Sequence, residues 1–317
     1  MRYSLCSRFR GTLLGAAVGK MVWTTGVTEK SGKGENKNTL SSGERIAVLS
    51  IQSLIRLGRF DLEDWRNTLS AADSILQPFE TFSEQNAMNC RHLQAIIGTL
   101  PISLFYHENE IKLRQNLQLA VVDGWQDDTI IQDGALAVGY ALAQSLTEKL
   151  NPASLIPQTI DFLGSQTQLA QALAQVQTLL EHGAGIQLAV THLGGDTQLS
   201  TPIALAFYCF LSTWEDLRLS VVRAAQKGYQ SQLTSIITGA LSGAYNSTPG
   251  IPVTLRMALS RFDAKHLLAW GIKTEAEVLE LSDSLFAVWS GVYDRATNQN
   301  DLTSPTAIAA PGVIRSH

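Results

Sequence analysis

The 317-residue sequence is poor in cysteine, and its three cysteines suit neither a disulfide framework nor a zinc site. Cys6, Cys90 and Cys209 lie far apart, their number is odd, and no Cys-X-X-Cys spacing occurs. Small disulfide-rich folds and structural zinc sites need several cysteines at short, regular spacing. The cysteine pattern therefore favours three reduced thiols in a cytoplasmic protein.

Charge is also scarce, at 16% of residues, and it shows no basic excess. Lys and Arg number 24 against 28 Asp and Glu, which gives a formal net charge of −4. Binding to a phosphate backbone depends on clustered Lys and Arg, so nucleic acid is not expected as a partner. A membrane is not expected either, because no apolar run reaches the roughly 20 residues that span a bilayer; the run at Ile203–Trp214 is too short.

Signals for β-strands are almost absent, whereas apolar residues recur at helical spacing along most of the chain. Alternating runs of β-branched and aromatic residues are rare, and no Asn-Gly or Asp-Gly pair separates two of them. Small residues recur every three or four positions in GTLLGAAVG, GALAVGYALA and TGALSGAY, a pattern that predicts closely packed helices. We expect an all-α fold with helices that include Arg45–Leu57, Gly134–Leu150, Leu169–Leu180, Ile203–Leu211, Leu217–Ala225 and Val278–Trp289.

Two segments lack this periodicity and set the expected organisation of the chain. Thr24–Ser42 is polar and rich in glycine, which predicts a mobile surface loop. Its lysines are expected to be solvated, with closure over a neighbouring cleft as the alternative. Tyr293–His317 is rich in Pro, Thr and Asn and is expected to be a flexible C-terminal tail. Residues 1–292 are then expected to form one all-α domain.

Common catalytic motifs are missing. The sequence has no P-loop, no Gly-X-Ser-X-Gly elbow and no His-Glu-X-X-His. These absences argue against P-loop nucleotide hydrolysis, serine-dependent α/β-hydrolase chemistry and zinc-dependent proteolysis.

Two other segments carry a resemblance to a known family. Residues 8–19 read RFRGTLLGAAVG and residues 238–252 read TGALSGAYNSTPGIP. The first resembles the opening signature of the ADP-ribosylglycohydrolases, RxxGxLLGxAxGDA, and the second resembles the AGALAGAYxGxxxIP that closes the conserved part of that family. The resemblance covers roughly residues 8–255. It implies a compact, orthogonally packed multi-helix bundle of the ADP-ribosylglycohydrolase type.

The resemblance also implies a place for metal ions. In that family the motifs TDDT and GGDTDT stand at helix starts and hold two Mg²⁺ ions, whose demand for oxygen ligands suits aspartate. The metals orient ADP-ribose, and a carboxylate helps water attack the anomeric carbon.

This chain departs from both motifs. All four aspartates are replaced, and Lys20 stands where the opening signature has Asp. Neutral or absent groups cannot balance two divalent ions, so we expect the metal site to be lost and no cofactor to be bound. Aligned on the helices that follow, the degenerate pocket positions are Ser41, Ser42, Gly43, Gln230, Gln232 and Leu233, and Glu44 takes the place of the last Thr of TDDT.

Some carboxylates remain as alternatives. Asp127 and Asp128 in QDDT, with Asp196 in GGDT, resemble relocated metal motifs, although both lie out of the family's order. The competing interpretation is that Asp127 and Asp128 cap a helix. Glu44 is a weak candidate for a catalytic base, but a Glu in a first helical turn is more often a surface residue that stabilises the helix dipole.

Three functional hypotheses follow, and they leave open whether the protein is an enzyme. The favoured one is a pseudoenzyme: a non-catalytic binding or regulatory protein that binds an ADP-ribose-like small molecule or a protein partner. The second is a Mg-dependent hydrolase that removes ADP-ribose from protein side chains with the relocated aspartates or Glu44. The third is a purely structural interaction protein.

Overall fold

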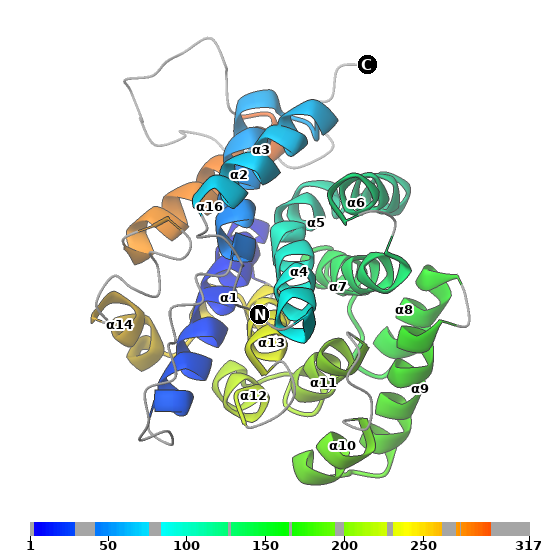
Figure 1. Cartoon of the computed structure of the whole chain (residues 1–317). Helices are drawn as coiled ribbons and strands as arrows, with labels where there is room; N and C mark the ends of the chain where they lie inside the picture. The colour runs from blue at the N-terminus through cyan, green and yellow to red at the C-terminus, as the bar shows by residue number, and fades with distance from the viewer. Residues whose placement is uncertain are drawn as a thin grey trace.

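Helices make up all the regular secondary structure in the described part of the chain. The computed structural model describes residues 3–28, 42–75, 84–125, 128–164, 167–193, 200–226, 231–261, 271–272 and 274–292. No strand occurs within these ranges, so the all-α prediction is confirmed (Figure 1). The elements are α1 (Leu5–Thr28), α2 (Ser42–Leu57), α3 (Leu62–Ile75), α4 (Glu84–Gly98), α5 (Leu100–Tyr106), α6 (Glu110–Trp125), α7 (Thr129–Leu146), α8 (Leu155–Leu163), α9 (Gln168–Glu181), α10 (Ile186–Leu193), α11 (Ser200–Leu211), α12 (Leu217–Ala224), α13 (Ser231–Asn246), the 3₁₀ helix η1 (Thr248–Gly250), α14 (Val253–Arg261) and α16 (Glu275–Ser290).

Helices α1 and α13, far apart in sequence, form the most extensive helix–helix contact of the fold. A Cβ atom on Gly15 would lie 2.1 Å from the carbonyl oxygen of Gly239, and one on Gly239 would lie 2.1 Å from the carbonyl oxygen of Gly15. No side chain fits at that separation, so only glycine allows the two backbones to touch. The small residues in the two family-like segments therefore serve this crossing.

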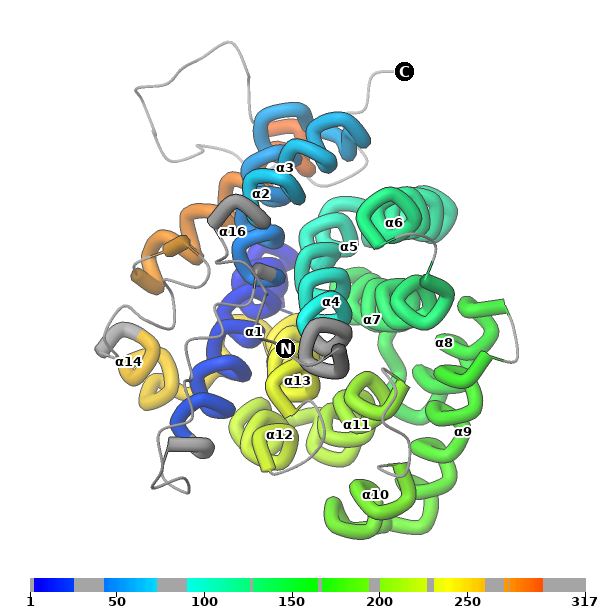
Figure 2. Tube along the Cα trace, viewed as in Figure 1, coloured from blue at the N-terminus to red at the C-terminus, as the bar shows by residue number. Residues whose placement is uncertain are grey.

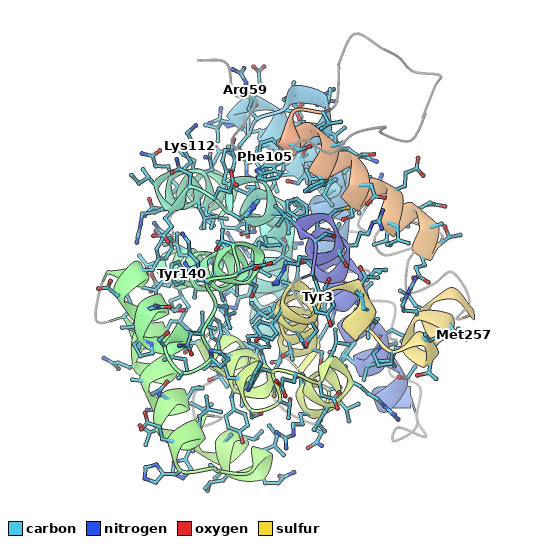
Figure 3. The ribbon with its side chains drawn as sticks, turned by 180° about the vertical axis from the view of Figure 1, so that it is seen from behind. Tyr3, Arg59, Phe105, Lys112, Tyr140 and Met257 are labelled. Atoms are coloured by element: carbon cyan, nitrogen blue, oxygen red, sulfur yellow. The ribbon has the colours of Figure 1, made fainter. Side chains whose placement is uncertain are left out.

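The core continues from α13 into α11 and α7, two helices that are apolar on nearly every side. All residues of α11 and those from Gly134 to Leu146 of α7 are buried. A helix that is apolar all round must be covered by other helices. The cover is visible in Figure 2, where α8, α9 and α10 lie outside α7 and α11. In the view from behind, Lys112 on α6 and Met257 on α14 mark opposite sides of the bundle (Figure 3).

The predicted loop at Thr24–Ser42 was wrong at its first residues. Helix α1 continues through Thr28, and α2 begins at Ser42. The polar side chains of this segment are accommodated within the helix: Thr24 Oγ1 donates to the Lys20 carbonyl at 2.8 Å and Thr25 Oγ1 to the Val22 carbonyl at 3.1 Å. The rest of the predicted loop, residues 29–41, and the predicted tail, residues 293–317, lie outside the described residues.

The N-terminal end of α1 is held by the last described helix, α16. Phe9 is completely buried, and its ring lies 5.5 Å from those of His107 and Phe286, while the His107 and Trp289 rings are 4.8 Å apart. At the edge of this aromatic cluster, Arg10 donates to both carboxylate oxygens of Asp283, at 2.5 and 2.6 Å. Burial lowers the pKa of His107 to about 4, so its imidazole is neutral at neutral pH.

The turn after α13 contains an unusual backbone conformation. Ser247 has φ 64° and ψ −179°, a region that is almost restricted to glycine. Its hydroxyl donates to Ser7 Oγ at 2.7 Å, which ties the turn to the start of α1. In the family pattern AGALAGAYxGxxxIP, position 247 corresponds to the last glycine, so a serine occupies a glycine conformation here.

None of the helices in the described part of the chain is both long enough and apolar enough to cross a membrane.

Candidate functional site

The carboxylate of Glu44 is completely buried in the first turn of α2. The sequence favoured a solvent-exposed Glu that only stabilises the helix dipole, and that interpretation was wrong. A charged carboxylate removed from water is costly unless another charge balances it. A positive charge is therefore expected beside Glu44.

The balancing charge comes from Lys20 on α1. Its Nζ lies 2.9 Å from Glu44 Oε1, and the Lys20 side chain is only 8% exposed. The same ammonium lies 5.6 Å from the centre of the Trp23 ring, within the range of a cation–π contact. Position 20, where the family signature has Asp, therefore carries the positive partner of a buried ion pair.

The pair leaves some hydrogen-bonding capacity unused. Among the described residues, neither oxygen of Glu44 has a well-directed hydrogen bond, so the contact with Lys20 is electrostatic rather than a directed bond. The amide nitrogen of Gln232, on the first turn of α13, is likewise buried without a partner among the described residues. Buried polar atoms without a hydrogen-bond partner are uncommon in folded proteins. Where they occur, a ligand or an ordered water often supplies the missing partner.

The start of α13 is joined to the same region through α1. Trp23 Nε1 donates to Ser231 Oγ at 2.9 Å, so the ring that lies beside the Lys20 ammonium also contacts the first residue of α13. Lys20, Trp23, Glu44 and Ser231 thus form one linked set, which we call the Lys20 cluster. The two helix starts that the family resemblance singled out meet at this cluster.

Helix α4 closes the other side of α2. A Cβ atom on Gly43 would lie 2.8 Å from the Leu93 carbonyl oxygen, so the start of α2 presses directly on the α4 backbone. Cys90, also on α4, lies close enough for Lys20 and Glu44 to influence its thiol electrostatically. Burial is the main effect and raises the pKa of that thiol, so Cys90 is uncharged at neutral pH.

The structure describes only some of the residues that the sequence singled out. Gly43, Glu44 and Gln232 lie at the two helix starts, and Leu233 is buried in α13. Ser42 begins α2, but its side chain is not described. Outside the described residues lie Ser41, Gln230, Asp127 and Asp196.

Asp128 is the N-cap residue of α7. Its Oδ1 accepts hydrogen bonds from the backbone N–H groups of Ile130 at 3.0 Å and Ile131 at 3.2 Å. The capping interpretation is therefore confirmed for Asp128. Within the described ranges, no group of three or more His, Cys, Asp or Glu residues is placed to hold a metal. Since its other two members are not described, the relocated site stays a prediction.

Sequence reasoning missed two residues of this region. Trp23 directly precedes the predicted loop, and the course of α1 places its ring beside Lys20. His92 on α4 is buried, and its Nδ1 has no partner among the described residues. Burial lowers the pKa of His92, although Asp128 opposes that effect. No sequence signal distinguished either residue.

Comparison with known proteins agrees with the architecture. A family model described as ADP-ribosylglycohydrolase matches residues 1–295. A solved structure described as "ADP-ribosylglycohydrolase-related protein complex" superposes with a TM-score of 0.60 at 15% identity, covering 91% of this chain and 100% of that one. At that identity the likeness shows the fold alone. No curated protein matches the chain significantly.

Proposed function

Since the chain belongs to the ADP-ribosylglycohydrolase family, we propose that it is a non-catalytic member: a binding or regulatory protein for an ADP-ribose-like small molecule or a protein partner. The observation that carries the proposal is the buried ion pair between Lys20 and Glu44. It lies where the family resemblance implies that metal-binding carboxylates should be.

The donor groups at these positions do not fit a pair of Mg²⁺ ions. Each Mg²⁺ needs about six oxygen ligands, several of them anionic. Among the described residues at the motif positions, Glu44 is the one carboxylate and Gln232 supplies a neutral amide. The Lys20 ammonium, 2.9 Å from that carboxylate, would repel any cation placed beside it. No catalytic step through a metal is therefore part of the proposal.

Glu44 is also poorly placed to act as a general base on its own. A base must reach the proton of an attacking water within hydrogen-bonding distance. The side chain of Glu44 is 0% exposed, and the Lys20 ammonium lies 2.9 Å from it. The arrangement supports a structural charge pair in place of a catalytic carboxylate.

Binding remains chemically reasonable at this position. The buried amide nitrogen of Gln232 can donate to a ligand oxygen. Residues of this kind recognise hydroxyl and amide groups without metal ions, which suits a nucleotide-like ligand.

Two assays test the proposal. A peptide carrying ADP-ribosylated arginine, incubated with the protein and MgCl₂ or MnCl₂, should release no ADP-ribose. Isothermal titration calorimetry with ADP-ribose in EDTA should show heat, and Gln232→Ala should weaken the affinity about fivefold to tenfold, as the loss of one hydrogen bond does. Gln115→Ala on the exposed face of α6 serves as the matched control.

The outcomes separate the alternatives. Metal-dependent release of ADP-ribose would show an active hydrolase and contradict the proposal. An absence of both heat and release would favour the purely structural interaction protein. Loss of any released product in Asp128→Asn would point to the relocated aspartates.

We further propose a cytoplasmic location, supported by the three free cysteines, Cys6, Cys90 and Cys209. Cell fractionation against cytoplasmic and membrane markers tests it.

A further inference from the structure

We infer that the ammonium of Lys20 is a tethered cation: it neutralises Glu44 and joins α1 to α2 at the place that the family gives to metal ions, and it keeps divalent cations out. The inference rests on the proposed function only in requiring that no metal be bound there. On this inference, the Lys20 ammonium replaces the metal ion, which is why these residues differ from the family's ligand set.

Glu44 needs a positive charge beside it. Its carboxylate is 0% exposed, and a lone buried carboxylate is strongly unfavourable. Lys20 Nζ at 2.9 Å is the charge that meets this demand. The neighbouring Cys90 does not alter the balance, because burial raises its pKa and leaves the thiol uncharged. Within the described ranges, one positive and one negative charge therefore balance each other at this position.

Lys20 lies on a part of α1 whose backbone is held in place by α13. The preceding residue, Gly19, belongs to the close crossing of α1 and α13: a Cβ there would lie 2.1 Å from the Ser235 carbonyl oxygen. The backbone that carries Lys20 is thus fixed by contact between main chains. Trp23, one turn further on, contacts both the ammonium and Ser231. The tethered charge is held in place from α13 as well as from α1.

The ion pair connects two parts of the fold. Helix α1 packs mainly on α13, whereas α2 packs mainly on α4. The contact of Lys20 with Glu44 links these two helix pairs through charge. A divalent ion bridging carboxylates from two helix starts would make the same kind of link.

The test is thermal unfolding of the full chain in EDTA and in MgCl₂. The wild type should melt at the same temperature in both. Lys20→Met should melt about 5 to 10 °C lower, because it leaves a buried carboxylate unpaired. The double variant Lys20→Met with Glu44→Leu should recover most of that loss, since apolar groups can replace a buried ion pair. Arg59→Met, which breaks the exposed pair with Asp61, is the control and should change little.

A variant designed to gain Mg²⁺ binding tests whether the charge at position 20 excludes the metal ion. Lys20→Asp places a second carboxylate beside Glu44, and its melting temperature should rise with MgCl₂ while that of the wild type does not. If Lys20→Asp does not fold, Lys20→Met and the double variant decide the matter alone.

Three results would overturn the inference: stabilisation of the wild type by MgCl₂, an unchanged melting temperature in Lys20→Met, or a folded Lys20→Asp that does not respond to MgCl₂. Hydrolysis of ADP-ribosylarginine by the wild type would instead overturn the proposed function, and the melting temperatures would still decide this inference separately.

Discussion

The two ends of α1 differ in how far their ion pairs are buried. At the N-terminal end Phe9, His107 and Trp289 form buried aromatic contacts, and each ion pair keeps a partner that reaches solvent. Arg10 and Asp283 are both about 40% exposed. Arg8 is buried, but its partner Glu148 is 31% exposed. At the C-terminal end, Lys20 and Glu44 form an ion pair that is almost fully buried. Apolar packing of similar volume is usually at least as stable as a buried ion pair. Stability alone therefore does not account for the buried pair, which is consistent with the proposal that Lys20 acts as a tethered cation.

The sharpest way to break this contrast is to remove the charge of Glu44. Glu44→Gln keeps the shape but leaves the Lys20 ammonium buried without its partner, so the free energy of unfolding should fall by about 3 to 5 kcal/mol. Urea unfolding at pH 7 measures it. Asp61→Asn at the exposed pair with Arg59 should change stability by less than about 1 kcal/mol. Equal losses in both variants would mean that burial of the first pair has no energetic consequence.

Lowering the pH should reduce stability through His107, at the N-terminal end of α1. The pKa of His107 is about 4 in the folded protein against 6.5 ordinarily, so its contribution to stability is complete above pH 6.5 and is lost as pH falls towards 4. The unfolded chain takes up the proton first, and the loss should reach about 3 kcal/mol. Urea unfolding from pH 7 to pH 4 measures this slope. His107→Gln, which cannot titrate, should have a shallower slope, and an unchanged slope would assign the acid sensitivity to other groups.

The helices of both regions could be predicted from sequence, but the Lys20 cluster could not. Arg45–Leu57, which lies in α2, and Val278–Trp289, which lies in α16, were predicted because apolar residues at a period of 3.6 report burial of one helix face directly. Lys20 and Glu44 were each noticed as departures from a family pattern. Their pairing depends on where α1 and α2 end up in space, and no local signal encodes that. The continuation of α1 through Thr28 was also missed, because the polar composition of this segment resembles that of a loop.

A smaller effect should appear at Ser247, beside the N-terminal end of α1. Its backbone conformation suits glycine, so Ser247→Gly should be more stable than Ser247→Ala by about 1 to 2 kcal/mol, the reverse of the usual order of alanine and glycine. Chemical denaturation of the two variants gives the difference directly. A more stable alanine variant would show that the backbone relaxes out of this conformation. Neither variant should alter ADP-ribose binding, because this end of α1 lies away from the Lys20 cluster.

The smallest effect is expected at Arg10. Its bond to Asp283 is bidentate but solvent-exposed, so Arg10→Ala should cost about 1 kcal/mol or less, and the cost should shrink further in high salt. Denaturation at low and high ionic strength measures both quantities. A loss as large as that of Glu44→Gln would remove the distinction between the two ends of α1.

The contact of Gly43 with α4 sets how closely α2 and α4 can approach. A side chain at position 43 would begin 2.8 Å from the Leu93 carbonyl oxygen, so any residue other than glycine requires α2 and α4 to move apart. An aspartate at this position would have to open the contact before it could bind a metal ion. Close packing of the two helix backbones and metal binding at position 43 therefore exclude each other.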